Sequence, residues 1–265
     1  MRRNRFIFYI IIFLTFSFTH AQLDSKNYLV RTINSEINID GIGDEIEWNK
    51  SKWQSNFWMW RPTDSLQAKK QTRFKVIRND KYLFILIESD TDGKNFNTPN
   101  LKRDFSTYPT DYLTLLFDTF NDGTNAFSFA TNPIGLKADG LISGGNQNYR
   151  TDRNYAWDTK WNVATQINEN SFIAEIRIPF SSFFYDNSQQ FWRFNIYRGN
   201  TQINESSTWI KIPQNQLIGN LAFMGKMIFE TPLEKGRNPI SLIPYLSSAA
   251  QKDFIYSSSK SNISL

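Results

Sequence analysis

A stretch of alternating residues from 157 to 180, WDTKWNVATQINENSFIAEIRIPF, constrains the fold of this chain more than any other segment. Strand-favouring side chains recur at every second position over residues 161–167 and again over residues 172–178. This period of two is typical of strands that place one face on a core. The Asn-Glu-Asn sequence at 168–170 suits a tight turn, and Pro179 ends the second strand because proline lacks a ladder N–H. A lone hairpin is unstable in water, so the remaining chain must supply an opposing sheet.

Similar strand patterns recur along most of the chain. Aromatic residues, which favour strands, are abundant, with 23 Phe, 11 Tyr and 8 Trp. About ten or eleven short strands fit between residues 36 and 230, separated by polar turn clusters. Residues 83–87 are apolar without interruption, which predicts a strand buried on both faces. Long polar loops are expected at 90–110 and 143–155. The predicted fold class is all-β, an antiparallel two-sheet β-sandwich that is jelly-roll-like.

The first 21 residues have the features of a secretory signal peptide. Arg2, Arg3 and Arg5 precede a mostly apolar run over residues 6–18, and Thr-His-Ala at 19–21 resembles a cleavage site. The apolar run is short for a membrane span, although a retained N-terminal anchor is the alternative. We therefore expect an exported protein of the periplasm, the outer membrane or the cell surface.

Removal of this segment changes what the composition excludes. The whole chain has 30 basic and 25 acidic residues, and three of the basic ones leave with the signal, so the mature net charge is +2. That small excess does not predict a nucleic-acid partner. The single His, His20, also leaves, and the chain contains no Cys. Ser-His-Asp and Cys-His catalysis, disulfides and the usual zinc sites are thereby excluded.

The chain after the signal peptide divides into three predicted parts. Residues 22–35 form a lead-in segment, and residues 36–230 form the β-sandwich. Residues 231–265 begin as a Pro- and Gly-containing linker and then start a new alternating segment. We interpret this segment as the start of a truncated C-terminal domain, because a strand pair without partners is unstable. A flexible C-terminal tail is the alternative.

Short motifs in order across residues 36–230 resemble the family 9-like carbohydrate-binding module. The form they resemble lies at the N-terminus of Bacteroidetes-type proteins that continue into an outer-membrane β-barrel. The matching motifs include Ile39-Asp40-Gly41, Trp60-Arg61-Pro62, Asp111-Tyr112, Phe117-Asp118, Asn132-Pro133-Ile134-Gly135, Trp157-Asp158 and Ile178-Pro179-Phe180. The resemblance implies a β-sandwich that binds poly- or oligosaccharides and accompanies glycoside hydrolases in polysaccharide catabolism. It also implies an outer-membrane partner, reached through a C-terminal domain that starts near residue 240.

Three tryptophans are candidate sugar-binding residues. Trp58 and Trp60 share one face of a predicted strand beside the loop at 62–65, and Trp157 follows the second long polar loop. Flat aromatic rings pack on the apolar faces of pyranose rings, and the indole N–H can donate to a hydroxyl. The alternative for Trp58 and Trp60 is that this strand face is simply core.

Two arginines are further candidates. Arg103 lies in the first long loop, and Arg198 lies at the end of a predicted strand near Glu205. A guanidinium can bind two hydroxyls or one carboxylate in a forked arrangement. A structural ion pair, such as Arg198 with Glu205, explains the same residues and is the favoured interpretation.

The sequence also offers a weak metal site and a weak catalytic alternative. Asp118, Asn121 and Asp122 place oxygen ligands at a short spacing that suits a structural Ca²⁺, although a tight β-turn explains them equally. No other cofactor is predicted. An O-glycosyl hydrolase would need a pair of carboxylates, and no acidic cluster on a single strand supplies one. The leading hypothesis is thus a non-catalytic carbohydrate-binding domain, and the other alternative is a structural domain of a barrel protein.

Overall fold

The fold was derived from a computed structural model that describes residues 26–99, 101–107, 109–148, 151–233, 249–255 and 258–264. The predicted hairpin is present as β9 (Asn162–Ile167) and β10 (Ser171–Pro179), paired antiparallel with Ile176 opposite Val163. Its turn is closed by the N–H of Asn168, which donates to the carbonyl of Ser171 at 2.8 Å. Strand β9 lies at one edge of the sheet, whereas Ala174 and Ile176 of β10 are fully buried.

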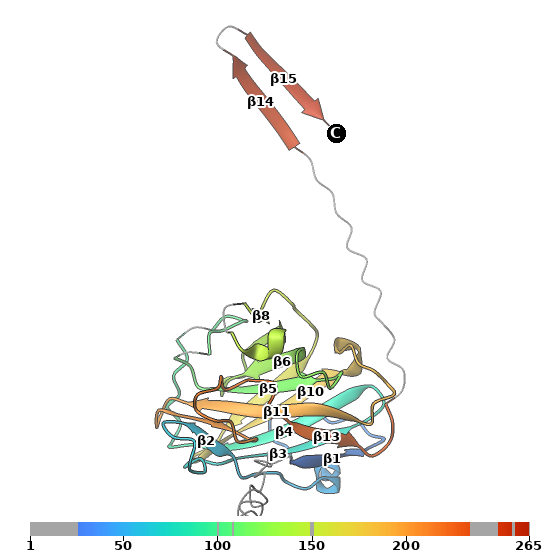
Figure 1. Ribbon diagram of the computed structural model, residues 1–265, viewed down its shortest axis with the longest axis vertical. Helices are drawn as coiled ribbons and strands as arrows, with labels where there is room; N and C mark the ends of the chain where they lie inside the picture. The colour runs from blue at the N-terminus through green and yellow to red at the C-terminus, as the bar shows by residue number, and fades with distance from the viewer. Residues whose placement is uncertain are drawn as a thin grey trace, which may run out of the picture.

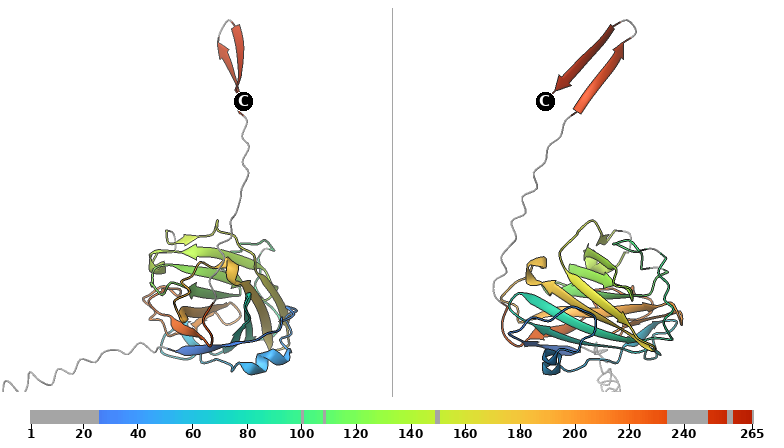
Figure 2. Two further views of the ribbon diagram at one scale, coloured as in Figure 1. Left: turned by 90° about the vertical axis from the view of Figure 1, so that its right-hand side faces the viewer. Right: turned by 180° about the vertical axis from the view of Figure 1, so that it is seen from behind.

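Thirteen strands form one continuous, strongly curled sheet, whose two halves face each other across the core (Figures 1 and 2). The first half has the order β8-β7-β6-β5-β11-β13-β1, and the second half has the order β1-β3-β4-β10-β9. Strand β12 pairs with β11 and with β2. The bounds not yet given are β1 (Asn27–Thr32), β2 (Trp58–Arg61), β3 (Thr72–Arg78), β4 (Tyr82–Asp90), β5 (Tyr112–Asp118), β6 (Ala126–Thr131), β7 (Lys137–Ile142), β8 (Arg153–Asn154), β11 (Phe191–Asn200), β12 (Glu205–Thr208) and β13 (Gly225–Phe229).

The two halves are joined by β1, which the sequence did not reveal. Its residues 27–30 pair with β13, and its residues 31–32 pair with β3. Both pairings are parallel, so the sandwich is mixed rather than purely antiparallel, as had been expected. The segment at 22–35 therefore supplies a strand of the fold and is more than a lead-in. The all-β sandwich itself is confirmed, because α-helix is absent from the described ranges, which contain only the short 3-10 helices η1 (Ile46–Lys50), η2 (Gly144–Asn146) and η3 (Phe180–Ser182).

The main core lies between the two halves and is rich in phenylalanine. Phe74 of β3 packs edge-to-face against Phe194 of β11 at 5.7 Å, and Phe117 of β5 lies 4.9 Å from the same ring. Strand β4 is buried on both faces, as predicted: Leu83, Ile85 and Ile87 face the main core, while Phe84 and Leu86 contribute to a second cluster. That second cluster lies between β3, β4 and the segment that contains η1.

A buried carboxylate fastens this covering segment to β10. Glu175 accepts hydrogen bonds from the N–H groups of Asp40 and Gly41 and from Nε1 of Trp48, each at 3.1 Å. Burial, together with the nearby charge of Glu45, raises the pKa of Glu175 to about 7. Gly41 has a φ of +88°, and a Cβ there would lie 2.9 Å from the backbone of Thr165. The Ile-Asp-Gly motif is thus a docking segment of the sandwich.

The C-terminal part contains a separate hairpin of β14 (Ala249–Ile255) and β15 (Ser258–Ser264). Most of the alternating segment expected from residue 240 lies outside the described residues, as does the predicted signal peptide, so both stay predictions. A search of the described helices found none with the length and hydropathy required to cross a membrane.

Candidate functional site

One face of the first half-sheet carries a ligand-sized depression. Alternate residues of β5, such as Leu113 and Leu115, point into the main core, so Thr114 points to the opposite side, here called the outer face. Part of the outer face is covered by the segment after β12, through Ile212, Ile218 and other residues of a third hydrophobic cluster. The uncovered part contains two adjoining cavities of about 560 and 320 Å³, and Thr107 lines both. We call them together the outer hollow.

The strand register explains the depth of the smaller cavity. Tyr197 of β11 lies opposite Thr114 of β5, which lies opposite Ala130 of β6, which lies opposite Ala138 of β7. The side chains in this row decrease in size from the Tyr197 ring to the methyl groups of Ala130 and Ala138, so the cavity deepens beside Tyr197. The wall on the far side includes Tyr155, which is 52% exposed.

The larger cavity depends on a close approach of Tyr112 to Gly199. The two residues lie opposite each other on β5 and β11, and a Cβ on Gly199 would lie 2.3 Å from Cε1 of Tyr112. Glycine therefore allows the Tyr112 ring to lie on the sheet at this position. Tyr112 and Tyr197 contact edge-to-face, with centroids 6.0 Å apart. The Tyr112 ring thus lines the larger cavity beside the ring that lines the smaller one.

Three buried polar atoms on the lining have no hydrogen-bond partner among the described residues. They are Oη of Tyr197, Oγ1 of Thr114 and Nδ2 of Asn200. All three residues are at most 5% exposed. A buried polar group that forms no hydrogen bond costs about 1–3 kcal/mol, and others occur elsewhere in the described residues, as at Nε1 of Trp192 and of Trp209 in the core. A ligand hydroxyl could pair with these atoms once the side chains that close them to solvent shift.

Arg103 links the loop that walls the smaller cavity to the sheet. Its Nη2 lies 2.6 Å from Oδ1 of Asp139 and also contacts the carboxylate of Asp158. Asp139 lines the cavity and also accepts from the N–H of Thr159 at 2.7 Å, while burial raises its pKa. The Arg103 side chain is 35% exposed, and the residue lies beside the hollow as part of an ion-pair cluster.

Of the three predicted tryptophans, only Trp60 lines the outer hollow. It is 8% exposed, its Nε1 donates to the carbonyl of Gln216 at 3.1 Å, and the guanidinium of Arg61 lies 4.6 Å from its ring. Trp60 therefore forms a wall whose ring is already partly covered.

Trp58 and Trp157 lie away from the lining. The ammonium group of Lys211 lies 4.8 Å from the Trp58 ring. Trp157 packs against Phe127 at 5.4 Å and Phe129 at 6.1 Å, at the margin of the main core.

Arg198 is buried beneath the outer hollow and is bonded within the protein. It is 2% exposed, and its guanidinium donates to the carbonyls of Asp90 at 2.6 Å and Lys70 at 3.3 Å. Burial lowers its pKa to about 10. The expected ion pair with Glu205 is not a direct contact, because the Glu205 carboxylate accepts instead from the N–H of Lys69 at 3.1 Å. Arg198 is thus held by backbone carbonyls in place of the ion pair that the sequence favoured, and its role in ligand binding stays a prediction.

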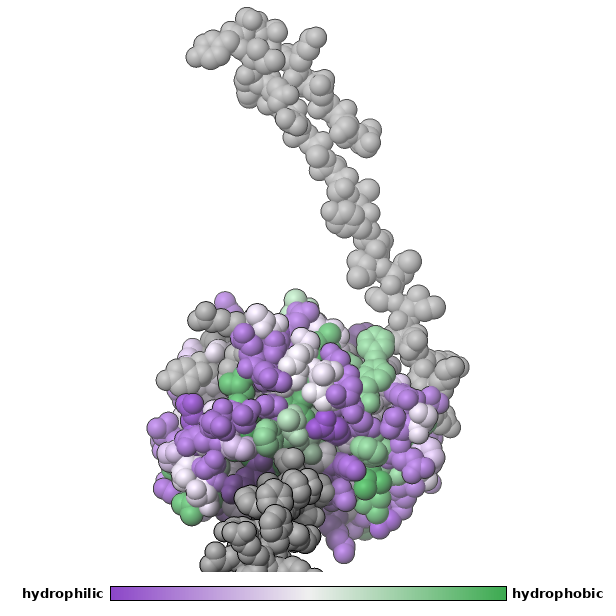
Figure 3. Space-filling view, viewed as in Figure 1, coloured by the Kyte–Doolittle hydropathy of each residue, from purple (hydrophilic) through white to green (hydrophobic). Residues whose placement is uncertain are grey.

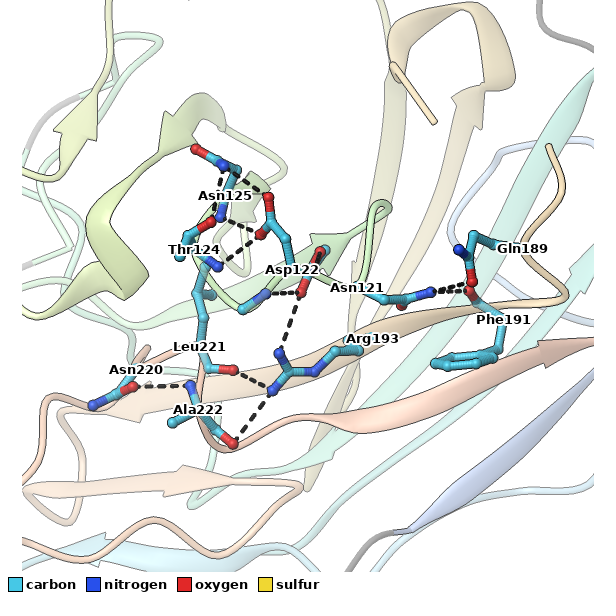
Figure 4. A network of polar contacts seen from close by, with 12 residues as sticks. Asn121, Asp122, Thr124, Asn125, Gln189, Phe191, Arg193, Asn220, Leu221 and Ala222 are labelled. Carbon is cyan, nitrogen blue, oxygen red and sulfur yellow. Dashed lines mark hydrogen bonds and ion pairs between the residues drawn. The ribbon is translucent and has the colours of Figure 1, made fainter. Parts of the chain in front are cut away.

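The oxygen-rich loop after β5 is closed by its own hydrogen bonds (Figure 4). Asp118 accepts from the N–H groups of Asp122 and Gly123 and faces the guanidinium of Arg193 at 3.4 Å. Asp122 accepts from the N–H groups of Thr124 and Asn125 at 2.7 and 2.8 Å.

A cation at this loop would have to displace these donors and approach an arginine, so the residues present do not fit a calcium site. A search of the described residues found no group of three or more His, Cys, Asp or Glu that could hold a metal. The tight turn accounts for the motif, and calcium binding stays a prediction.

Sequence reasoning missed the residues that form the floor of the hollow. Tyr112, Thr114, Tyr197 and Asn200 were given no ligand-binding role, and Tyr155 was placed in a polar loop without one. The available signal was the polar hydroxyl of Thr114 within an otherwise apolar strand. It could mark an outward position, but only the register reveals that Tyr197 lies beside it.

A two-sheet, all-β sandwich with an aromatic and polar hollow on one outer sheet face defines a ligand-binding β-sandwich domain. More specifically, the chain belongs to the carbohydrate family 9 binding domain-like family, whose profile matches residues 39–230.

Among solved structures, a candidate carbohydrate-binding protein from Bacteroides uniformis has a similar fold, with a TM-score of 0.62, 13% identity, and coverage of 78% of this chain and 100% of that chain. A family 9 carbohydrate-binding module from Caldicellulosiruptor kristjanssonii, in complex with cellotriose, has a TM-score of 0.49 and 18% identity, covering 84% of this chain and 100% of its own. A comparison with curated proteins found no match.

Proposed function

We propose that this domain binds a saccharide in the outer hollow. The observation that carries the proposal is the pair of buried, unpaired hydroxyls of Tyr197 and Thr114 at the floor. The half-exposed ring of Tyr155 lies at the wall of the same cavity. Membership of the family supports the same ligand class.

The chemistry of the hollow matches the two sides of a sugar ring. A pyranose has an apolar C–H face that packs on an aromatic ring, and hydroxyl groups that donate and accept. Hydroxyls at the floor can exchange hydrogen bonds with those groups, and Asn200 supplies an additional donor in the larger cavity. The combined volume is in the range of small-molecule sites.

Tyr197→Phe tests the proposal without removing the ring. Because the Oη has no protein partner, we expect the variant to fold with unchanged or slightly higher stability. If the hydroxyl binds a sugar, affinity for the best ligand of a glycan panel should fall about tenfold. Isothermal titration calorimetry measures the affinity, and a urea titration measures the stability.

The matched control is Tyr82→Phe, which removes a hydroxyl from a half-buried tyrosine in the second hydrophobic cluster. Its affinity should equal that of the wild type. Thr114→Val removes the neighbouring unpaired hydroxyl with little change in shape and should also weaken binding. Equal affinity in wild type, Tyr197→Phe and Thr114→Val would contradict the assignment of this hollow, and no binding to any glycan by folded protein would contradict the function.

We further propose that the protein is exported and acts in the cell envelope during polysaccharide catabolism. The proposal rests on the Arg-rich start and apolar run of residues 1–21 and on the sugar-binding family. A mature N-terminus at Gln22 in the expressed protein, determined by mass spectrometry, would support it. Full-length protein retained in the cytoplasm would refute it.

A further inference from the structure

A further cavity of about 320 Å³, separate from the two that form the outer hollow, lies at the other end of β5, β6 and β7 and is lined by aromatic side chains. Its described lining shares no residue with the outer hollow. Phe120 follows β5, Phe127 lies on β6, Leu141 lies on β7, and Phe184 follows η3. We call this cavity the Phe184 hollow.

The exposure of its two rim rings is exceptional for this protein. On the face in Figure 3, hydrophobic residues lie in separate patches among hydrophilic ones. Among the phenylalanines of residues 26–233 whose exposure is described, only Phe120 and Phe184 are exposed, at 47% and 54%, and both line this one cavity. Exposed aromatic rings gathered at one depression mark interaction sites more often than isolated ones do.

The Phe184 ring is held in place from below. It stacks on Phe127 with an interplanar angle of 30° and centroids 6.5 Å apart. Phe127 in turn packs against Trp157 and Phe183 at the margin of the main core. The hydroxyl of Thr119 donates to the carbonyl of Phe184 at 2.5 Å, which anchors its backbone. A ring held in this way loses little conformational freedom when a ligand packs on it.

The polar part of the lining is uncharged. Thr119, Asn125, Ser143 and Asn154 contribute hydroxyl and amide groups around the aromatic surface, and no Asp, Glu, Lys or Arg belongs to the described lining. An ionic ligand would find no counter-charge. The Thr119 hydroxyl and the Asn125 amide already donate to Phe184 and Asp122, so Thr119 keeps acceptor lone pairs and Asn125 keeps its Oδ1 for the hydroxyls of a ligand. The lining fits an uncharged molecule that has both an apolar face and several hydroxyls.

We propose that the Phe184 hollow is a second saccharide-binding site, which takes one uncharged pyranose unit against Phe184 and Phe120. The ligand class rests on the proposed function, but the site is separate from the outer hollow. Two sites on one domain raise its retention on a polysaccharide through effective concentration, even when each site alone binds weakly. Trp157, which was predicted to bind sugar directly, would instead support the stacked Phe127 ring.

Residue-resolved NMR distinguishes the two sites. The isotope-labelled protein is titrated with cellotriose, xylotriose and mannotriose, and with an uncharged tripeptide that contains Leu and Phe. We expect a trisaccharide to shift the amide signals of Asn125, Ser143 and Asn154 as a group, separately from those of Thr114 and Tyr197. Phe184→Ala should abolish the shifts of the first group or weaken that site about tenfold, and leave the second group unchanged.

Three further variants complete the test. Phe120→Ala should act as Phe184→Ala does, whereas Tyr155→Ala should affect only the outer hollow. Leu66→Ala is the matched control, because Leu66 is 57% exposed and lines neither cavity.

Each pattern of shifts decides between the two sites. Shifts of the outer hollow alone would overturn the second site and leave the proposed function intact. Shifts of the Phe184 hollow alone would support it and overturn the first site. Shifts there with the tripeptide only would identify a peptide site and refute the proposal, and no sugar-induced shift at either site would refute both proposals.

Discussion

Glu175→Ala is expected to lower the free energy of unfolding by about 1–3 kcal/mol, because it leaves the N–H of Gly41 without an acceptor. It also removes one of two acceptors from the N–H of Asp40, which donates as well to the carbonyl of Asn38, and from the indole of Trp48, which donates as well to Glu45. Urea titration measures the loss. An alanine variant with wild-type stability would show that water replaces the carboxylate and that the covering segment is not fastened by it.

The same residue gives the stability a defined pH dependence. The pKa of Glu175 is about 7 in the folded protein against 4.5 for the free group, so between these values only the folded state holds the proton. Protonation therefore stabilises the fold at low pH, and this contribution, at most about 3 kcal/mol, is lost as the pH rises through 7. Burial also raises the pKa values of Asp118, Asp139 and Glu205, which act in the same direction.

Glu175→Gln distinguishes the effect of titrating Glu175 from the effect of its hydrogen bonds. The amide keeps one acceptor oxygen for the N–H groups of Asp40 and Gly41 but cannot titrate. We expect the fall in unfolding free energy between pH 5 and pH 8 to be smaller in this variant than in the wild type. An identical pH profile in both proteins would assign the dependence to other groups.

Arg198→Ala is expected to lower the unfolding free energy by about 3–5 kcal/mol, because it removes a fully buried charged donor. The carbonyls of Asp90 and Lys70 would lose their partner, and the nearby carboxylates of Asp111 and Glu205 would lose a compensating charge. Thermal and urea unfolding measure the effect. Arg198→Lys should retain the charge but only part of the hydrogen bonding, so its loss should be intermediate.

The matched control is Arg73→Ala, which removes an exposed strand arginine paired with Glu88 and should cost less than about 1 kcal/mol. An Arg198→Ala protein that keeps its melting temperature but no longer binds a glycan would contradict the structural role. It would instead make Arg198 a ligand-binding residue.

The sequence was most informative where a pattern is local. The alternation at 161–178 predicted β9, β10 and their turn, and the apolar run at 83–87 predicted a strand buried on both faces. Both depend only on the period of side chains along one strand. Strand β1 was missed because its short segment carries no strong pattern. Its position is set by partners 46 and 199 residues away, which local periodicity cannot reveal.

The candidate site was harder to predict for the same reason. Tryptophan was favoured as a sugar-stacking residue, but most tryptophans here fill the core, as Trp192 and Trp209 do at 0% exposure. The hollow forms where the side chains are small, at Ala130, Ala138 and Gly199, beside tyrosines from other strands. Small residues carry no chemical signature in a sequence, so only the register across four strands identifies the cavity.

The parallel pairing of β1 with β13 has a consequence for how the domain forms. The first strand of the sandwich hydrogen-bonds to its last strand, so the first half-sheet is not complete until the chain has been made through Phe229, although every strand of the second half has been made by Pro179. Closing a loop of this length carries a large entropic cost, and folds rich in such distant contacts form slowly. A chain that emerges from the ribosome or a membrane channel would therefore remain open until late. That delay would suit the export proposed above, because an unfolded chain passes more easily through a membrane channel.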